Sequence, residues 1–174
     1  MGTIRKATSI AASQQVASGR HSTIVTNDWF DFLSALLAAR VRFLVVGAHA
    51  LAAHGVPRAT QDLDVWIEPT VENAQRVWSA LGHFGAPADA LGITESDLIT
   101  PDTVVQFGVP PNRIDILTAI SGVPLFSRAW DARIEHIIRG QTIPFLGKSD
   151  FVMNKRASGR HKDLGDIEAL GEQV

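Results

Sequence analysis

Residues 43–68 read FLVVGAHALAAHGVPRATQDLDVWIE, and their order predicts three connected elements. The short, apolar, β-branched run over 42–46 predicts a buried strand that stops at Gly47. A short helix follows over 48–54 and is closed by a glycine. The strict alternation of apolar and polar residues over 62–68 then predicts a second strand, one face of which is polar.

The polar face of this second strand carries two carboxylates. Asp62 and Asp64 are two residues apart, so both side chains project from the same side and can approach one cation. Two anions this close on a core strand are costly unless a divalent cation neutralises them. Mg²⁺ is the expected ion because it prefers hard oxygen ligands.

Gly47 and Asp115 strengthen this signal. The turn at Gly47 gathers the first backbone N–H groups of the predicted helix, which suits phosphate oxygens. Asp115 lies in the apolar run IDIL, where a charge needs a partner. Taken singly, these features also fit an ordinary strand-to-helix turn and acids that face solvent at a sheet edge. Together they suit three carboxylates, two metal ions and a triphosphate.

The flanking segments predict both helices and antiparallel hairpins. Hairpins are predicted from 103–107 with 113–117, and from 134–139 with 142–146. Helices are predicted from Asn27 or Asp28 onward, from the cap Thr70 to near Gly82, from the cap Ser149 to about Ala157, and over 162–170.

Length and composition fit one globular domain. The chain has 174 residues, of which 45% are hydrophobic and 20% charged, and we assign the domain to 27–174. Residues 1–26 are interpreted as a mobile N-terminal tail without a secretory signal. The net charge of −2 excludes a strong overall field for nucleic acid or membrane, and the apolar runs are too short to cross a bilayer. The absence of cysteine is compatible with the cytoplasm.

Two parts of the chain resemble a known superfamily. Nucleotidyltransferases show Gly-Gly or Gly-Ser, then Asp-x-Asp or Asp-x-Glu, then a third Asp, and the chain resembles this in Gly47-Ala48, Asp62-Leu-Asp64 and Asp115. The later run Lys155-Arg-Ala-Ser-Gly-Arg160-His-Lys162-Asp163-Leu-Gly-Asp166 is similar to minimal bacterial nucleotidyltransferases akin to the AbiEii toxins. The resemblance extends over about 43–170.

The resemblance implies an α+β fold of α/β-like character, with a mixed β-sheet flanked by helices as in polymerase β. It implies that Asp62, Asp64 and Asp115 are catalytic and hold Mg²⁺ or Mn²⁺, with an NTP as substrate; Asp115 is also a candidate base. Arg58, Thr60 and His49 are added by their positions beside these motifs, whereas the resemblance adds Lys155, Arg160, Lys162, Asp163 and Asp166. The candidate nucleotide-binding residues are Gly47, Ala48, Arg58, Thr60 and Lys155, and a secondary set comprises His49, Arg160, Lys162, Asp163 and Asp166.

Several of these residues also have a simpler explanation. His49 is more simply a helix-surface histidine bonded to water, and Lys155 belongs to a solvated basic helix face unless the resemblance holds. Asp163 is expected as a helix N-cap and Asp166 as an exposed first-turn anion. Trp66 alternates with the carboxylates and is a candidate to stack on a base; the other tryptophans, Trp29, Trp78 and Trp130, are expected in the core.

The resulting hypothesis is transfer of a nucleoside monophosphate from an NTP to an acceptor hydroxyl, with release of pyrophosphate. The acceptor is RNA, such as a tRNA end, a protein or a small molecule. The alternative is a weak or inactive nucleotide-binding protein that acts with a cognate partner in a toxin–antitoxin-type system. Its basis is Ala48, which stands where related enzymes have Gly or Ser and offers no hydroxyl. A carboxylate-metal phosphohydrolase, with water as acceptor, is a third possibility.

Overall fold

The computed structural model of the protein describes residues 5–6 and 27–173. Its helices are α1 (Asn27–Ala38), α2 (Gly47–Ala53), α3 (Val71–Phe84), α4 (Phe126–Asp131), α5 (Lys148–Ser158) and α6 (His161–Ala169), with a 3₁₀ turn at Glu95–Leu98. Its strands are β1 (Arg5–Lys6), β2 (Phe43–Val45), β3 (Asp62–Ile67), β4 (Val104–Phe107), β5 (Arg113–Leu117), β6 (Ile134–Ile138) and β7 (Gln141–Phe145).

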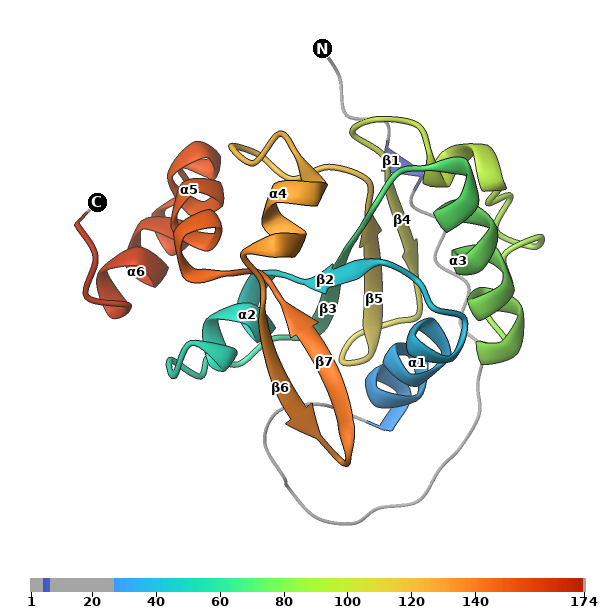
Figure 1. Ribbon diagram of the computed structural model, residues 1–174, viewed down its shortest axis with the longest axis horizontal. Coiled ribbons are helices and arrows are strands. Elements are labelled where there is room, and N and C mark those ends of the chain that lie inside the picture. Colours follow the sequence, from blue (N-terminus) through green and yellow to red (C-terminus); the bar gives the residue numbers. More distant parts are fainter. Residues whose placement is uncertain (1–4, 7–26, 174) are drawn as a thin grey trace.

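The strands form one mixed sheet in the order β1-β4-β5-β3-β2-β7-β6 (Figure 1). β3 runs parallel to β5 and antiparallel to β2, so the two strands that carry acids are neighbours near the middle of the sheet. The register sets Asp64 beside Asp115 and Asp62 beside Arg113. Strand pairing therefore brings together carboxylates that are distant in sequence.

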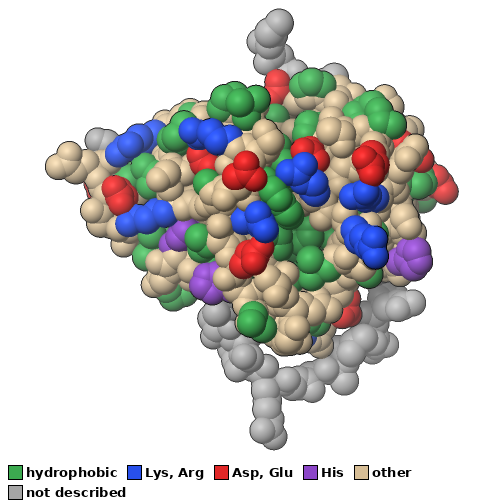
Figure 2. Space-filling model, viewed as in Figure 1, with side chains coloured by type: hydrophobic (Ala, Val, Ile, Leu, Met, Phe, Trp, Pro, Cys, Tyr) green, Lys and Arg blue, Asp and Glu red, His purple; other side chains and the backbone are tan. Residues whose placement is uncertain are grey.

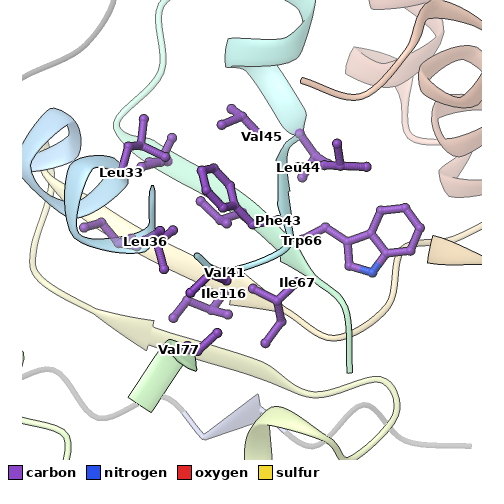
Figure 3. Close-up of a cluster of buried hydrophobic side chains, with 14 of the residues drawn as sticks. Leu33, Leu36, Val41, Phe43, Leu44, Val45, Trp66, Ile67, Val77 and Ile116 are labelled. Atoms are coloured by element: carbon purple, nitrogen blue, oxygen red, sulfur yellow. The ribbon is translucent and has the colours of Figure 1, made fainter. Parts of the chain in front are cut away.

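Helices α1 and α3 pack on one face of the sheet (Figure 1). Their apolar stripes and the inward side chains of β2, β3 and β5 form the core, shown in Figure 3 with Leu33, Leu36, Phe43, Val77 and Ile116. Burial of these side chains is the main stabilising contribution, at about 1.5–3 kcal/mol for each large apolar residue. This core fixes β3 and β5, and hence the acids they carry.

Helices α4, α5 and α6 lie away from α1 and α3 (Figure 1). Arg128 of α4 pairs with the buried Asp150 of α5, which ties the two helices together. Gly147 precedes α5 and lies so close to Ala132 that a Cβ on it would be 2.2 Å from the Ala132 carbonyl oxygen. These contacts hold the start of α5 against α4 and the residue that follows it.

The predicted α+β fold with a mixed, helix-flanked sheet is confirmed. The strand, glycine turn, helix and acidic strand lie where they were predicted, as do both hairpins, and the Thr70 hydroxyl accepts a hydrogen bond from the backbone of Asn73. The prediction of Ser149 as a cap is wrong, because α5 begins at Lys148 after Gly147.

Two short helical elements and one short strand were not predicted. α4 and the 3₁₀ turn are too brief to show a helical period. β1 lies inside the predicted N-terminal tail and pairs with β4 in parallel; residues 1–4 and 7–26 of that tail lie outside the described residues. Among the described residues no helix is both long enough and apolar enough to cross a membrane.

Candidate active site

Three carboxylates meet at the sheet, as the sequence predicted. Asp62 and Asp64 point from β3 and Asp115 from the neighbouring β5. One oxygen from each of the three lies within 4.8 Å of the other two, which is close enough for one divalent cation to bridge them. Asp115 is buried, and the other two acids are half-buried.

Gly47 allows the β2–α2 turn to approach this acid cluster. Its φ is +65°, and a Cβ on it would lie 2.1 Å from the Oδ2 atom of Asp64. Only glycine fits here, because other residues are strained at a positive φ and because any side chain at this position would collide with the Asp64 carboxylate. The glycine predicted from sequence as a phosphate-binding turn is thus also the residue that makes room for Asp64.

Asp64 is the least compensated acid of the cluster. Burial raises its pKa from 3.8 to about 6, and the charges of Asp62 and Asp115 add to the rise, while Lys155 and Arg113 oppose it. A raised pKa in a carboxylate between two others means that the ionised form is short of positive charge. This donor set fits a hard divalent cation such as Mg²⁺ or Mn²⁺.

Arg113 supplies part of the missing charge, although it belongs to none of the predicted motifs. Its Nε atom lies 2.9 Å from Asp115 Oδ1, and its Nη2 atom lies 3.2 Å from Asp115 Oδ2 and also pairs with Asp62 Oδ2. Gln106 on β4 donates to Asp115 Oδ2 at 2.9 Å. The available signal was the spacing: a residue two before Asp115 on a strand shares its face.

A cavity of about 520 Å³ opens over the acid cluster. It has an acidic wall from β3 and β5 and a basic wall from α5, α6 and the turn between them. Ten candidate site residues line it, namely Gly47, Ala48, Arg58, Thr60, Asp62, Asp64, Asp115, Lys155, Arg160 and Lys162. Three do not: His49, Asp163 and Asp166. Lining residues outside the predicted set include Arg113, Gln106, Ser121, Asn154 and Ser158.

Lys155 sits in a buried ion network behind the basic wall. Its ammonium lies 2.8 Å from Asp163 Oδ1 and 2.9 Å from Asp166 Oδ2, and each of the three residues is at most 4% exposed. Arg160 adds a 2.5 Å contact to Asp163, and Arg58 a 3.2 Å contact to Asp166. Burial favours the neutral acid, but bonds from Arg160 and Lys155 hold the pKa of Asp163 below its ordinary value.

This network overturns the simpler explanations given above for its members. Lys155 does not belong to a solvated helix face, Asp163 is not an N-cap and Asp166 is not exposed. The N-cap position of α6 is taken by Arg160 instead. The three residues meet because α5 and α6 fold back on each other at Gly159, whose φ is +63°.

His49 and Trp66 also differ from expectation. His49 is 6% exposed and packs edge-on against Trp29 at 4.8 Å, so it is no surface histidine, and its Nε2 atom lacks a hydrogen-bond partner. Burial lowers its pKa to about 4 although the charge of Asp62 acts to raise it. Trp66 is 2% exposed, packs on Phe126 and donates to the Thr118 carbonyl, so it is not free to stack on a base.

Arg58 and Thr60 occupy different places around the acids. Thr60 donates its hydroxyl to Asp62 Oδ1 and so orients that carboxylate. Arg58 pairs with Asp166 rather than with Asp62 or Asp64, although it lines the same cavity. Ala48 also lines the cavity and is 6% exposed.

Comparison with protein families gives a match over most of the chain. The family model described as "Nucleotidyltransferase of unknown function (DUF6036)" matches residues 30–171. This range includes every residue that lines the cavity, from Val46 to Lys162. Comparison with curated proteins found no match.

Proposed function

The chain belongs to the nucleotidyltransferase family DUF6036, and from this premise we propose that it transfers a nucleoside monophosphate from an NTP to an acceptor hydroxyl, releasing pyrophosphate. The observation that carries the proposal is the meeting of Asp62, Asp64 and Asp115 within 4.8 Å. Such a cluster suits the two-metal chemistry of phosphoryl and nucleotidyl transfer.

The three carboxylates would hold Mg²⁺ or Mn²⁺. When bound, the ions supply positive charge at the α-phosphate and at the leaving pyrophosphate. Thr60 fixes Asp62 through its hydroxyl, and Gln106 fixes Asp115 through its amide, so the ligands are oriented in advance. Asp115 completes the ligand set and is also a candidate acceptor for the proton of the attacking hydroxyl.

The basic wall of the cavity is suited to the triphosphate. Of the cations that line the cavity in the described part of the chain, Lys162 is exposed and has no carboxylate partner. Arg160 is also exposed but shares its charge with Asp163, and Lys155 is engaged with two acids. We therefore assign the direct phosphate contact to Lys162 and Arg160, and to Lys155 a supporting charge behind them.

The volume of the cavity and the mixed charge of the surface favour a small or single-stranded acceptor. A cavity of about 520 Å³ lies within the usual range for small-molecule sites, about 300–1,000 Å³. On the face shown in Figure 2, Lys and Arg side chains alternate with Asp and Glu and form no continuous basic stripe. We propose an RNA 3′ end such as that of tRNA as acceptor, in a cytoplasmic setting, with a protein or small alcohol as the other candidates.

The test is label transfer. Purified protein is incubated with each α-³²P-labelled NTP, Mg²⁺ or Mn²⁺, and total RNA or candidate proteins, beside a control with Asp62→Asn and Asp64→Asn. Label on an acceptor in the wild type but not in the control supports the proposal. Equal labelling in both proteins, or release of NTP or RNA hydrolysis products in place of transfer, contradicts it; the second result identifies a phosphohydrolase.

Ala48 supports a second candidate, nucleotide binding without turnover in a toxin–antitoxin-type pair. Its methyl group stands at the cavity wall where a serine would offer a hydroxyl. If the protein is a weakened enzyme, Ala48→Ser increases label transfer. If it is a binding partner, the wild type binds NTP with no transfer to any acceptor tested, and Ala48→Ser does not create activity.

A further inference from the structure

We propose that Arg113 is an internal counter-ion of the acid cluster. Its side chain leaves these acids when a metal ion binds there, and then binds the phosphates of the incoming nucleotide. Metal and nucleotide binding are thereby coupled through one side chain. The inference rests on the proposed function and adds a role for a residue that the sequence motifs leave out.

The contacts of Arg113 coincide with the oxygens that a metal needs. Its guanidinium contacts both oxygens of Asp115, at 2.9 and 3.2 Å, and also pairs with Asp62. The planar fork of donors spans two carboxylates on neighbouring strands, because Arg113 lies opposite Asp62 in register and two residues before Asp115. Gln106 adds a second donor to the Oδ2 atom of Asp115.

A guanidinium in this position competes with a divalent cation. The two bind the same carboxylate groups, and their like charges repel at short range in a half-buried site. In the described part of the chain, the hydrogen bonds of the Arg113 guanidinium reach Asp62 and Asp115 but not Asp64. A metal ion that binds all three must therefore displace Arg113 from its contacts.

The cavity can accommodate the Arg113 side chain after it leaves the acids. Arg113 lines the cavity, and its side chain is 34% exposed, so the core does not hold it in its present rotamer. Lys162 and Arg160 line the cavity too, and a triphosphate held there would offer oxygens to a second guanidinium. Arginine binds phosphate through paired donors, so one residue can exchange carboxylates for phosphates without losing its charge partners.

Arg133 offers a matched control. It too precedes a carboxylate by two residues at a strand, and its Nε atom lies 2.9 Å from Glu135 Oε1. This pair lies on β6 and its approach, and neither residue lines the cavity. The variant Arg133→Met therefore removes an equivalent Arg–carboxylate contact and leaves the contacts of the acid cluster unchanged.

The test measures binding of Mn²⁺ alone by the electron paramagnetic resonance signal of the free ion. We expect Arg113→Met to bind Mn²⁺ about tenfold more tightly than the wild type, within the range usual for coupled sites. Arg113→Lys should fall between the two, since an ammonium reaches fewer carboxylate oxygens, and Arg133→Met should match the wild type. Circular dichroism and thermal unfolding confirm that each variant is folded; if Arg113→Met is not, Arg113→Lys decides.

A second measurement addresses the phosphates. Calorimetric titration with inorganic tripolyphosphate at saturating Mn²⁺ should show about tenfold weaker binding to Arg113→Met than to the wild type. Mn²⁺ affinity that falls or stays equal in Arg113→Met overturns the inference, because the arginine would then orient the acids rather than compete with the metal. Mn²⁺ affinity that is unaffected by Asp62→Asn with Asp64→Asn overturns the metal site itself, and with it the proposed function.

Discussion

Asp64 carries a charge that the folded protein stabilises poorly. Its pKa of about 6 in the folded state is above the ordinary 3.8, so the folded protein binds this proton more tightly than the unfolded chain. The stabilising effect of that proton is complete below about pH 4 and is lost as the pH rises through 6. At pH 7 the ionised acid therefore costs stability.

Asp64→Asn is expected to unfold at higher urea concentration than the wild type at pH 7 in the presence of EDTA. The gain should be about 1–3 kcal/mol, from the size of the pKa shift, and should shrink toward pH 4. Urea titrations at both pH values measure it. A variant less stable than the wild type at pH 7 would show that the carboxylate has a stabilising partner in the fold.

His49 acts on stability in the opposite direction. Its pKa of about 4 is below the ordinary 6.5, so between these values the unfolded chain takes up a proton that the folded protein refuses. The stability of the wild type therefore falls as the pH is lowered from 6.5 to 4. His49→Phe keeps an aromatic ring against Trp29 and removes the titration.

The difference in free energy of unfolding between His49→Phe and the wild type should rise by about 2–3 kcal/mol in favour of the variant from pH 7 to pH 4. Taking the difference cancels the other titrating groups. Urea curves at several pH values provide the measurement, and parallel pH profiles for the two proteins would contradict the buried, neutral histidine.

At the scale of elements, the α5–α6 pair depends on a buried lysine. Lys155→Met should destabilise the protein by about 3–5 kcal/mol, because it leaves Asp163 and Asp166 buried without their shared cation. Lys148→Met on the same helix removes an exposed pair with Glu172 and should cost no more than about 1 kcal/mol. Chemical unfolding compares the two, and equal losses would mean that the buried network contributes no more than a surface pair.

Local pattern predicted elements well where each residue's role depends on close neighbours. The apolar stripe after Thr70, the alternation over 62–68 and the glycine between β2 and α2 all report local geometry, and each is confirmed. Local sequence pattern gave the wrong environment for Lys155. A buried lysine on a helix has the same pattern as a solvent-exposed one, and only the fold shows that Lys155 meets Asp163 and Asp166 across the turn. The prediction of Ser149 as a cap failed similarly: the N-cap position is held by Gly147, whose close approach to Ala132 no local pattern signals.

The three acids of the candidate site were predicted from the sequence, but two residues that contact them, Arg113 and Gln106, were not. Asp62 and Asp64 share a strand face by simple alternation, and Asp115 followed from a charge in an apolar run. The spacing of Arg113 from Asp115 was a usable signal, but the contacts of Arg113 with Asp62 and of Gln106 with Asp115 depend on the register of β5 with its two neighbours, which sequence alone does not fix. His49 was judged a surface residue because nothing in its local pattern signals the packing of Trp29 against it.

For the whole molecule, the distance between α5 and the sheet sets the width of the cavity. Gly122, in the connection after β5, has a φ of +77°, and a Cβ on it would lie 2.7 Å from both the Ala157 Cβ and the Met153 carbonyl oxygen of α5. Asn154 of α5 also donates to the Ser121 carbonyl at 2.9 Å. The connection and the helix are thus in direct contact at the rim of the cavity.

Gly122→Ala should push α5 outward, lowering the midpoint of thermal unfolding and weakening tripolyphosphate binding about tenfold, a typical coupling between a structural shift and a site. Gly140→Ala is the control, since Gly140 has a φ of +81° and, among the described residues beyond its chain neighbours, no atom within 4 Å of its Cβ position. Both variants bear backbone strain, but only Gly122→Ala meets α5. Equal tripolyphosphate affinity in the two variants would show that the cavity tolerates a displaced helix.

The residues that form the two walls of the cavity are also synthesised at different times. At a translation rate of about 5–20 residues per second, the ribosome adds Val46 roughly 6–23 s before Lys162, and these are the first and last cavity-lining residues. Within that interval, from the addition of Asp115 until that of Lys155, a nascent chain has all three acids of the cluster but lacks Lys155, Arg160 and Lys162. A half-made protein therefore lacks a closed pocket, and any activity at this cavity begins only after synthesis has passed α6.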